Sequence, residues 1–419
     1  MGVREPSAKY LIRAGYKQTE LGVVPESWEI DRLDRFWSVL DCKHVTASFI
    51  ATGYPVASIK EVQSRFVDLT GANQTSQKFY SLLIEGGRRP RDGDLLLSRN
   101  ATVGETAQVA GWHPPFAMGQ DVCLLRKKSP ELSTGFLQGV FRSPIIGKQL
   151  SDLVVGSTFK RANVQQIRSL TVSMPPSAEQ EAIAAALSDA DALIESLEQL
   201  LAKKRQIRRG AMQELLRPRE TWQTEPLGKL FSISAGSWKR ASLHGAGRYV
   251  IMDMGSVSSS GKTIKSKRTD SAQDLLAHGD LVMPKDDIGG GWIIGKVAYI
   301  DDNDCYVLGD HVYRLQPLRT HINSHFFHFL INSSYISGPL SKKVAGSAQL
   351  GLGRKSVLEQ ASTFPIDVGE QSAIAGILAE IGAEIEAVEI RLKKARQLRQ
   401  GMMQVLLTGE IRLPLDVEK

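Results

Sequence analysis

Apolar residues recur at helical spacing in two long stretches of the chain, one in the middle and one near the C-terminus. In both stretches they step by four and three, with charged residues between them, which is typical of an amphipathic helix with a coiled-coil seam. Prolines precede both stretches and good helix formers dominate them, so the sequence predicts two long helices. The first seam contains Ile183, Leu187, Ala190, Ile194, Leu197 and Leu201, and the second contains Ile374, Leu378, Ile381, Ile385, Val388 and Leu392.

The two helical stretches are copies of one another. Residues 179–216 align without a gap with residues 370–407, from EQEAIA and EQSAIA at the start to MQELL and MQVLL at the end. A helix with one apolar seam cannot bury it alone, so we expect the copies to pack on each other, outside the cores of the globular domains. The alternative is a helix buried on its own globular domain, but two independent core helices need not resemble each other.

A second pattern repeats in the segments that precede the two helices. Short apolar runs bounded by Gly and Pro turns predict a mixed α/β (α+β) fold in both segments. The turn Gly93-Asp94-Leu95 corresponds to Gly279-Asp280-Leu281, and Trp28 corresponds to Trp222. The predicted organisation is an arm at 1–22, a first domain at 23–174, a central helical region at 175–217, a second domain at 218–364, and a C-terminal helical region with a tail at 365–419.

The connectivity predicts how the helical copies pair. The first helix leads from the first domain to the second, and the second helix leaves the second domain, so paired helices would run antiparallel and separate the domains. A helix of about 36 residues is roughly 54 Å long, which is the length of about 16 base pairs of B-DNA. Two domains with one skeleton and different loops, joined by a rigid spacer, would suit the reading of a two-part DNA site.

Composition narrows the class of protein. The 419 residues suffice for two or three domains, and the net charge of +7 favours a polyanionic partner without identifying it. Three cysteines, far apart in the sequence, give no disulfide framework and no paired zinc-ligand spacing, which predicts a cytoplasmic protein. The N-terminus lacks the apolar segment of a signal peptide, and the sequence has no apolar run of about 18 residues, so no membrane contact is expected.

The motifs that would indicate catalysis are incomplete. Residues 290–296 approach a phosphate-binding loop, but Val297 stands where Ser or Thr should bind magnesium, so a strand and turn is preferred. Residues 113–116, His-Pro-Pro-Phe, are similar to the catalytic tetrapeptide of amino-methyltransferases, but the first residue is not Asn or Asp. The eight histidines show no metal-ligand spacing. We therefore expect no catalytic residue, no metal site and no cofactor on this chain.

The order and duplication of these motifs resemble the specificity subunits of type I restriction–modification enzymes. The resemblance rests on the tandem halves, the EQ-x-x-I opening of each helix after a proline, the helix endings RQIRRGAMQELL and RQLRQGMMQVLLTGEI, and GDLLLSRNATVG in the first domain. Residues 41–46 are also similar to the first domain of this family, whereas residues 279–285 depart from the usual basic loop of the second. The resemblance covers nearly the whole chain.

Membership of this family would imply two target-recognition domains, each reading one half of a split, asymmetric sequence in double-stranded DNA. It would also imply that the helical regions fix the spacing and bind two modification (methyltransferase) subunits, which restriction (translocase and endonuclease) subunits can join. S-adenosylmethionine, ATP and Mg²⁺ would then be expected on these partner subunits rather than on this chain.

Candidate DNA-binding residues lie in predicted loops and strand ends and have side chains that suit phosphates or base edges. In the first domain these are Lys43, His44, Lys60, Arg99, Asn100, Thr102, Thr158, Lys160, Arg161 and Asn163. In the second they are Lys239, Arg240, Lys262, Lys265, Lys267, Arg268, Lys285, Gln349, Arg354 and Lys355. The cations on the helices are expected mostly to face water or a partner subunit, and they are Lys203, Lys204, Arg205, Arg208, Arg209, Lys393, Lys394, Arg396 and Arg399.

Two other functions fit parts of the sequence. A DNA methyltransferase with a degenerate motif would bind S-adenosylmethionine by itself. A scaffold whose coiled coil joins two protein-binding domains would show no salt-dependent retention on heparin or DNA. A non-catalytic, sequence-specific DNA-binding subunit is the preferred hypothesis, because the tandem repeat is complete whereas each catalytic motif is not.

Overall fold

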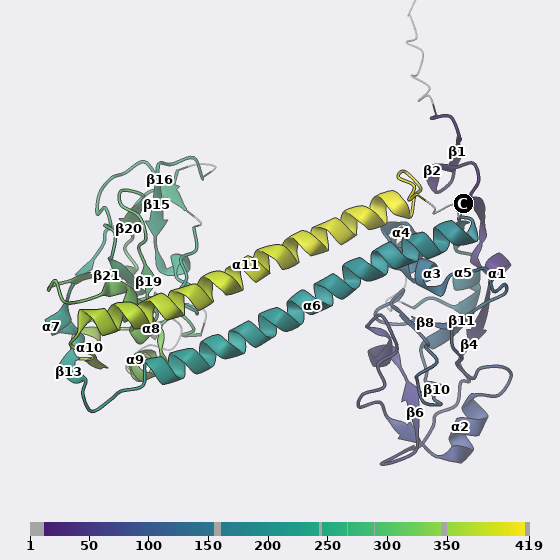
Figure 1. Ribbon diagram of the computed structural model, residues 1–419, viewed down its shortest axis with the longest axis horizontal. Helices are drawn as coiled ribbons and strands as arrows, with labels where there is room; N and C mark the ends of the chain where they lie inside the picture. Colours follow the sequence, from purple (N-terminus) through teal and green to yellow (C-terminus); the bar gives the residue numbers. More distant parts are fainter. Residues whose placement is uncertain are drawn as a thin grey trace, which may run out of the picture. The chain divides into compact units, whose positions relative to one another are not determined.

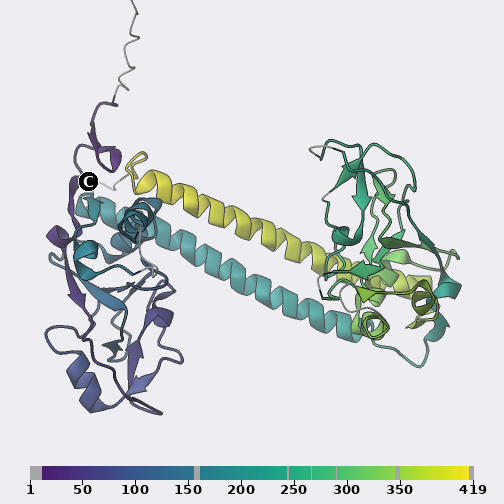
Figure 2. The same ribbon diagram turned by 180° about the vertical axis from the view of Figure 1, so that it is seen from behind.

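The computed structural model describes residues 12–154, 161–242, 245–265, 267–288, 290–344 and 350–414. The chain divides into two compact units, one formed by Met1–Leu197 with Arg391–Lys419 and the other by Glu198–Ile390. Each unit combines a globular α/β domain with one part of each long helix, α6 (Ser177–Leu215) and α11 (Val368–Leu406) (Figures 1 and 2). Within the described ranges, no helix is both long and apolar enough to cross a membrane.

The first unit is built on an antiparallel sheet with the strand order β4-β11-β8-β9. A second sheet, β10-β6-β7-β5, contains one parallel pair, β10 with β6, and two further pairs are β12 with β3 and β1 with β2. The strands are β1 (Tyr16–Thr19), β2 (Gly22–Pro25), β3 (Glu29–Arg32), β4 (Trp37–Asp41), β5 (Phe49–Ile50), β6 (Tyr54–Ala57), β7 (Gln74–Thr75), β8 (Leu95–Ser98), β9 (Thr106–Gln108), β10 (Ala117–Met118), β11 (Val122–Lys127) and β12 (Thr171–Met174). The short helices are α1 (Leu33–Phe36), η1 (Ile59–Val62), α2 (Gln77–Leu83), α3 (Thr134–Phe141), α4 (Pro144–Val154) and α5 (Val164–Arg168).

The second unit repeats this topology. Its main sheet has the order β14-β21-β17-β19, its second sheet has the order β16-β15-β20 with β15 and β20 parallel, and β13 pairs with β23. The strands are β13 (Gln223–Pro226), β14 (Phe231–Ala235), β15 (Tyr249–Met252), β16 (Arg268–Thr269), β17 (Leu281–Pro284), β18 (Asp286–Asp287), β19 (Ala298–Tyr299), β20 (Tyr306–Leu308), β21 (Val312–Pro317), β22 (Leu350–Gly351) and β23 (Ala361–Phe364). The short helices are α7 (Leu227–Leu230), η3 (Met254–Ser256), α8 (Ser324–Asn332), α9 (Ser334–Ser341) and α10 (Arg354–Leu358). The predicted tandem of mixed α/β domains is confirmed.

The duplicated Gly-Asp-Leu turn has a structural role in both units. Asp94 accepts a hydrogen bond from the backbone N–H of Arg91 and pairs with Arg126 at 2.7 Å, while Asp280 accepts from Ala277 and pairs with Arg314 at 2.7 Å. Both carboxylates are buried, and a buried carboxylate is costly unless it is paired. This turn is therefore repeated because the fold requires it.

The glutamate of the duplicated EQ motif is held in the same way in both units. In the first unit, Glu179 accepts a hydrogen bond from the Trp28 indole N–H at 3.1 Å and binds the Arg412 guanidinium through two contacts of 2.9 and 2.7 Å. In the second unit, Glu370 accepts from Trp222 at 3.2 Å and from Arg219 at 3.3 Å. Each cluster joins the start of a globular domain, the start of the helix that follows that domain, and the segment that follows the other long helix.

The glutamine of the same motif fixes the start of each long helix to the domain. The Gln180 side chain accepts a hydrogen bond from the backbone N–H of Ser133, at the start of α3, and donates one to the carbonyl of Pro175. Gln371 accepts from the backbone N–H of Asn323, at the start of α8, and donates to the carbonyl of Pro365. Gln180 and Gln371 are buried, so neither residue is free to contact DNA.

The two long helices run antiparallel within each unit. In the first unit, Asp191, in the first half of α6, pairs with Arg399, near the end of α11. In the second unit, Lys204 and Arg205 of α6 pair with Glu384 and Glu389 of α11 at 2.7 and 2.8 Å. The predicted antiparallel pairing is confirmed.

The seams divide into two kinds of position. Ile183 and Leu187 belong to the core of the first domain, which is completed by Met403 and Leu406 of α11 and by Leu407, which follows that helix. Ile374 and Leu378 likewise belong to the core of the second domain. The prediction that the seams lie outside the domain cores is therefore wrong for the first turns of each helix. The remaining buried seam residues belong to neither of these two cores: Leu197, Leu201, Ile385, Val388 and Leu392. Ile194 is half-buried.

Candidate nucleic-acid interface

One edge of the main sheet of the first unit collects several predicted DNA-binding residues. Because β11 runs antiparallel to β4 and β8, the C-terminal ends of β4 and β8 meet the start of β11 at the same edge. Lys43 and His44 follow β4, and Asn100 follows β8 and bridges to Arg161. Arg161 in turn lies 3.4 Å from Asp121, which precedes β11. Segments far apart in the sequence thus bring these side chains together.

Arg99 lies at this edge but inside the domain. Its guanidinium binds the Asp41 carboxylate at 2.7 Å, and the residue is 3% exposed. The other carboxylate oxygen of Asp41 lies 3.2 Å from the His44 ring, and Lys43 pairs with Glu85. Arg99 lies at a strand end, as predicted, but it is buried against Asp41 and therefore holds the start of the loop that carries Lys43 and His44.

Asp41, Cys42 and His44 are the one group of potential metal ligands found in the described part of the chain, with ligand atoms within 4.8 Å of one another. Its carboxylate is already bound to Arg99, and burial raises the pKa of the Cys42 thiol, which disfavours the thiolate that a metal would need. We therefore interpret the group as the hydrogen-bond network of this loop rather than as a metal centre.

The other first-domain candidates differ in how free they are. Lys60 is exposed in η1, and Thr102 accepts a hydrogen bond from Gln63 at 3.2 Å. The Asn163 side chain caps α5 by accepting from the backbone N–H of Gln166, so it is engaged in the fold. Thr158 and Lys160 lie outside the described residues.

The corresponding edge of the second unit contains Lys239 and Lys285. Lys285 follows β17 and is half-buried, and its backbone N–H donates to the carbonyl of His311, just before β21. Lys239 follows β14, but its ammonium group is buried against Asp274 at 2.8 Å and the Leu308 carbonyl at 2.6 Å. Hydrogen bonding to Lys239 lowers the pKa of Asp274. Lys239 therefore lies in a loop, as predicted, but it is a buried structural lysine whose charge is bound within the domain.

Four predicted cations of the second domain lie between Ser258 and Thr269. Lys262, Lys265 and Lys267 are exposed, and hydrogen bonding to Asp253 at 2.7 Å raises the pKa of Lys267. Arg268 is half-buried and donates to the backbone carbonyls of Gly247 and Arg248, so it is held by the fold. The three exposed lysines form a basic loop, residues 258–268, beside the second sheet.

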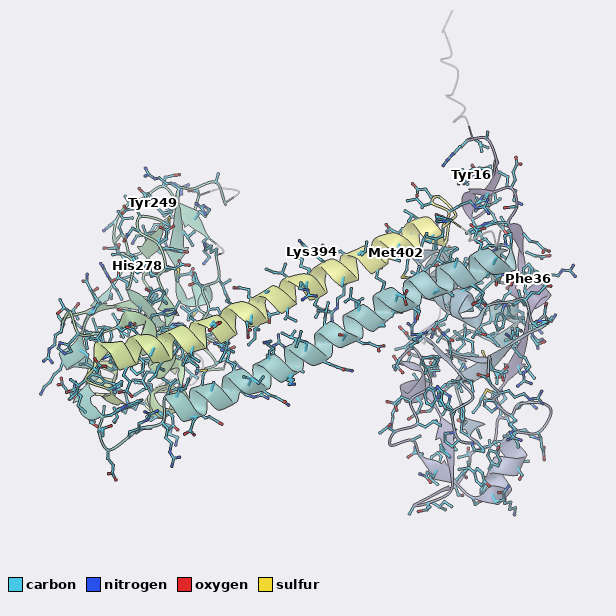
Figure 3. All side chains as sticks on the ribbon, viewed as in Figure 1. Tyr16, Phe36, Tyr249, His278, Lys394 and Met402 are labelled. Atoms are coloured by element: carbon cyan, nitrogen blue, oxygen red, sulfur yellow. The ribbon has the colours of Figure 1, made fainter. Side chains whose placement is uncertain are left out.

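The last second-domain candidates are exposed side chains with few restraints. Arg240 and Arg354 are exposed, and Lys355 forms only a loose pair with Glu359, 3.8 Å away. Gln349 lies outside the described residues. Figure 3 labels Tyr249 and His278 in the second domain, which carries these candidates.

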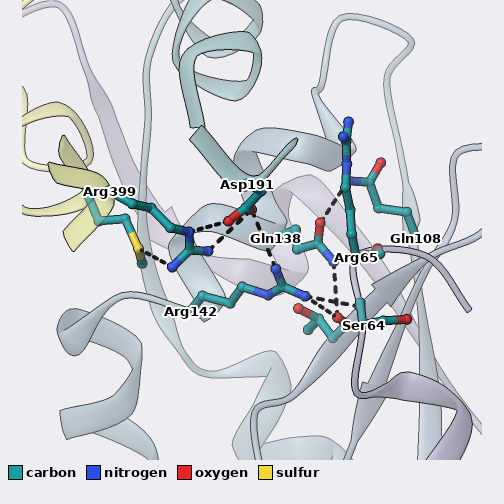
Figure 4. Close-up of polar contacts among 9 residues, drawn as sticks. Ser64, Arg65, Gln108, Gln138, Arg142, Asp191 and Arg399 are labelled. Carbon is teal, nitrogen blue, oxygen red and sulfur yellow. Dashed lines mark hydrogen bonds and ion pairs between the residues drawn. The ribbon is translucent and has the colours of Figure 1, made fainter. Parts of the chain in front are cut away.

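The sequence did not predict a polar recess of about 250 Å³ in the first unit. Asp191 of α6 binds Arg399 of α11 there and lies 3.8 Å from Arg142, which follows α3 (Figure 4). Arg399 was expected to face water or a partner, but it binds a carboxylate of its own chain. One feature of the sequence marks this arginine: Arg399 of α11 and Arg208 of α6 stand at the same position of the two repeats.

A family model described as "Type I restriction modification DNA specificity domain" matches the chain twice, at residues 51–204 and 219–394. Two relatives come from Methanocaldococcus jannaschii. The putative type I restriction enzyme MjaX specificity subunit is 23% identical, with 95% of this chain and 97% of that protein covered. The type I restriction enzyme MjaVIII specificity subunit is 22% identical, with 93% and 94% covered.

Solved structures show the same fold. The crystal structure of the S subunit of a type I restriction–modification system from M. genitalium has a TM-score of 0.62 at 15% identity and covers 90% of this chain and 96% of its own. A structure concerned with complex assembly and conformational transition of the type I R-M system has a TM-score of 0.53 at 14% identity, with 93% and 99% covered.

Proposed function

Because the chain belongs to the family of type I restriction–modification DNA specificity proteins, we propose that it is the DNA-reading subunit of such a complex. Each globular domain reads one half of a split, asymmetric sequence, and the paired helices set the distance between the halves. The observation that carries this proposal is the duplication of one topology with different side chains at corresponding sheet edges. One skeleton with two different surfaces suits two unrelated half-sites.

The chemistry of methylation and cleavage is assigned to partners. Two modification subunits would bind the helical regions and hold S-adenosylmethionine, and restriction subunits with ATP and Mg²⁺ would join them on DNA in the cytoplasm. Support comes from this chain's own residues, because the buried Asp and Glu side chains at the repeated motifs are bound to arginines. Such pairs hold the fold and leave no activated nucleophile or base at these positions.

The test is a map of methylated adenines in cells that express this chain with its modification subunit. We expect methylation at one bipartite sequence whose two halves differ and are separated by bases of any identity. Methylation at a continuous palindrome, or at no defined sequence, would contradict the proposal. Binding of S-adenosylmethionine by the isolated chain would favour a methyltransferase instead.

A further inference from the structure

A basic recess of about 460 Å³ lies in the second unit, between α6, α11, the end of α8 and the basic loop 258–268. Its lining includes Arg205, Arg208 and Arg209 of α6, Ser260 and Lys262 of the loop, and Glu389 of α11. Four cations therefore share the recess with one carboxylate, which gives it a positive potential.

The internal ion pairs leave part of this charge unbalanced. Arg205 binds Glu389 at 2.8 Å, and Lys262 lies 3.7 Å from Glu386. Arg208 and Arg209 form no ion pair with any residue that the structure describes. Arg208 is also half-buried, and burial lowers the pKa of its guanidinium. The carboxylate that acts on Arg208 is Glu389, which is already bound to Arg205. A partly desolvated guanidinium that shares its counter-charge in this way attracts a further anion more strongly than one in water does.

In the first unit, a carboxylate neutralises the arginine that corresponds to Arg208. Arg399 occupies the position of Arg208 in the other repeat, and it binds Asp191 together with Arg142 (Figure 4). In the second repeat the position of Asp191 is taken by Gly382, and the position of Arg142 by Asn332. The carboxylate that neutralises the first recess is therefore missing from the sequence at the matching place in the second.

We propose that this basic recess binds a backbone phosphate of the DNA, an inference that rests on the proposed function. A guanidinium can donate two parallel hydrogen bonds to phosphate oxygens, and the Ser260 hydroxyl, which also lines the recess, can donate another. DNA is favoured over an acidic protein group because Lys262 of the basic loop lines the recess, and the same loop carries two further exposed lysines, Lys265 and Lys267. A row of cations matches the repeated charges of a phosphodiester chain rather than a single carboxylate.

The first arm of the test removes the cation. The complex of this chain with its modification subunits is titrated with a duplex carrying the mapped target and with a scrambled duplex, over a series of salt concentrations. Arg208→Gln is expected to weaken binding to both duplexes by about fivefold and to reduce the slope of log affinity against log salt by about 0.9. Arg208→Lys keeps the charge and is expected to retain most of the slope.

The second arm adds the missing carboxylate without touching Arg208. A Cβ at Gly382 would meet no atom within 4 Å, so Gly382→Asp can be accommodated and should pair with Arg208 as Asp191 pairs with Arg399. It is expected to reproduce the lower slope of Arg208→Gln. Gly382→Asn is the uncharged control. Gly376→Asp adds the same charge to α11 at an exposed glycine that also has open space, and it should leave the slope unchanged.

The outcomes separate this inference from the function on which it rests. Wild-type preference for the target duplex with unchanged slopes in Arg208→Gln and Gly382→Asp would overturn the phosphate site alone. Weaker assembly with the modification subunit at an unchanged slope would also overturn it and assign the recess to a partner's carboxylate. Loss of target preference in the wild-type complex would instead contradict the proposed function.

Discussion

Single positions at which the two repeats differ show how one skeleton holds different interiors. Gln138, on α3, donates hydrogen bonds to the backbone carbonyls of Arg65 and Thr106. The matching residue on α8 is His328, and its burial lowers the pKa of the imidazole to about 3. His328 is therefore neutral inside the folded domain and becomes charged only when the domain unfolds or the medium is strongly acidic.

This histidine should make the second domain sensitive to acid. Below about pH 6.5 the unfolded chain binds a proton at this residue that the folded chain does not, so stability falls as the pH falls toward 3. His328→Gln, which installs the residue of the first repeat, should remove about 2 kcal/mol of this loss between about pH 7 and pH 5. The measurement is urea unfolding at several pH values.

The matched control is His278→Gln, at an exposed position of the same domain (Figure 3). Because this side chain is exposed, the substitution should change the pH dependence of unfolding much less than His328→Gln does. An equally steep loss of stability in His328→Gln would show that other groups cause the acid sensitivity.

At the scale of elements, each long helix is partly domain core and partly paired helix. Gly139 on α3 shows why, since a Cβ there would lie 2.9 Å from Leu187, and this close approach packs α6 onto the domain. Leu197 is also buried, at 4% exposed, but it belongs to neither large domain core. The middle of the helices therefore has a role that is separate from folding the domains.

We predict that Leu197→Asp disrupts the helical pair and weakens assembly with the modification subunit, while the globular domains stay folded. An unpaired carboxylate at a buried position costs about 3 kcal/mol. Leu193→Asp, at a position of α6 that is 46% exposed, is the control and should assemble normally. Assembly is measured by co-purification, and folding by circular dichroism and thermal unfolding. Loss of domain structure in Leu197→Asp would show that this part of the seam is core as well.

The elements were more predictable than the site. The helix repeat and its antiparallel pairing could be predicted because a seam and its copy are local patterns in the sequence. The burial of Arg99 and Lys239 could not be predicted from the sequence. It depends on their partners Asp41 and Asp274, respectively, which come close only when the strands pair. The sequence also could not show that each seam is part domain core and part helix pair. Ile183 and Leu197 occupy equivalent seam positions and differ only in what packs on them.

The molecule as a whole contains two domains with one topology and separate candidate surfaces. Each has its own core and its own cluster of Trp, Glu and Arg around the start of the helix that follows it. The candidate residues of each domain come from segments of that domain, at the ends of its own sheet and in its own loops. Recognition by one domain should therefore not depend on the side chains of the other.

The most direct measurement exchanges one domain. Trp28–Met174 is replaced by the equivalent segment of another member of the family, keeping small residues at the positions of Gly135 and Gly139 so that α6 can still pack. Methylated sequences are then mapped, with the reciprocal exchange of Trp222–Phe364 as the control. We predict that each exchange changes one half of the recognised sequence, that the two exchanges change opposite halves, and that the spacer stays the same. A change in both halves, or in neither, after a single exchange would contradict this prediction.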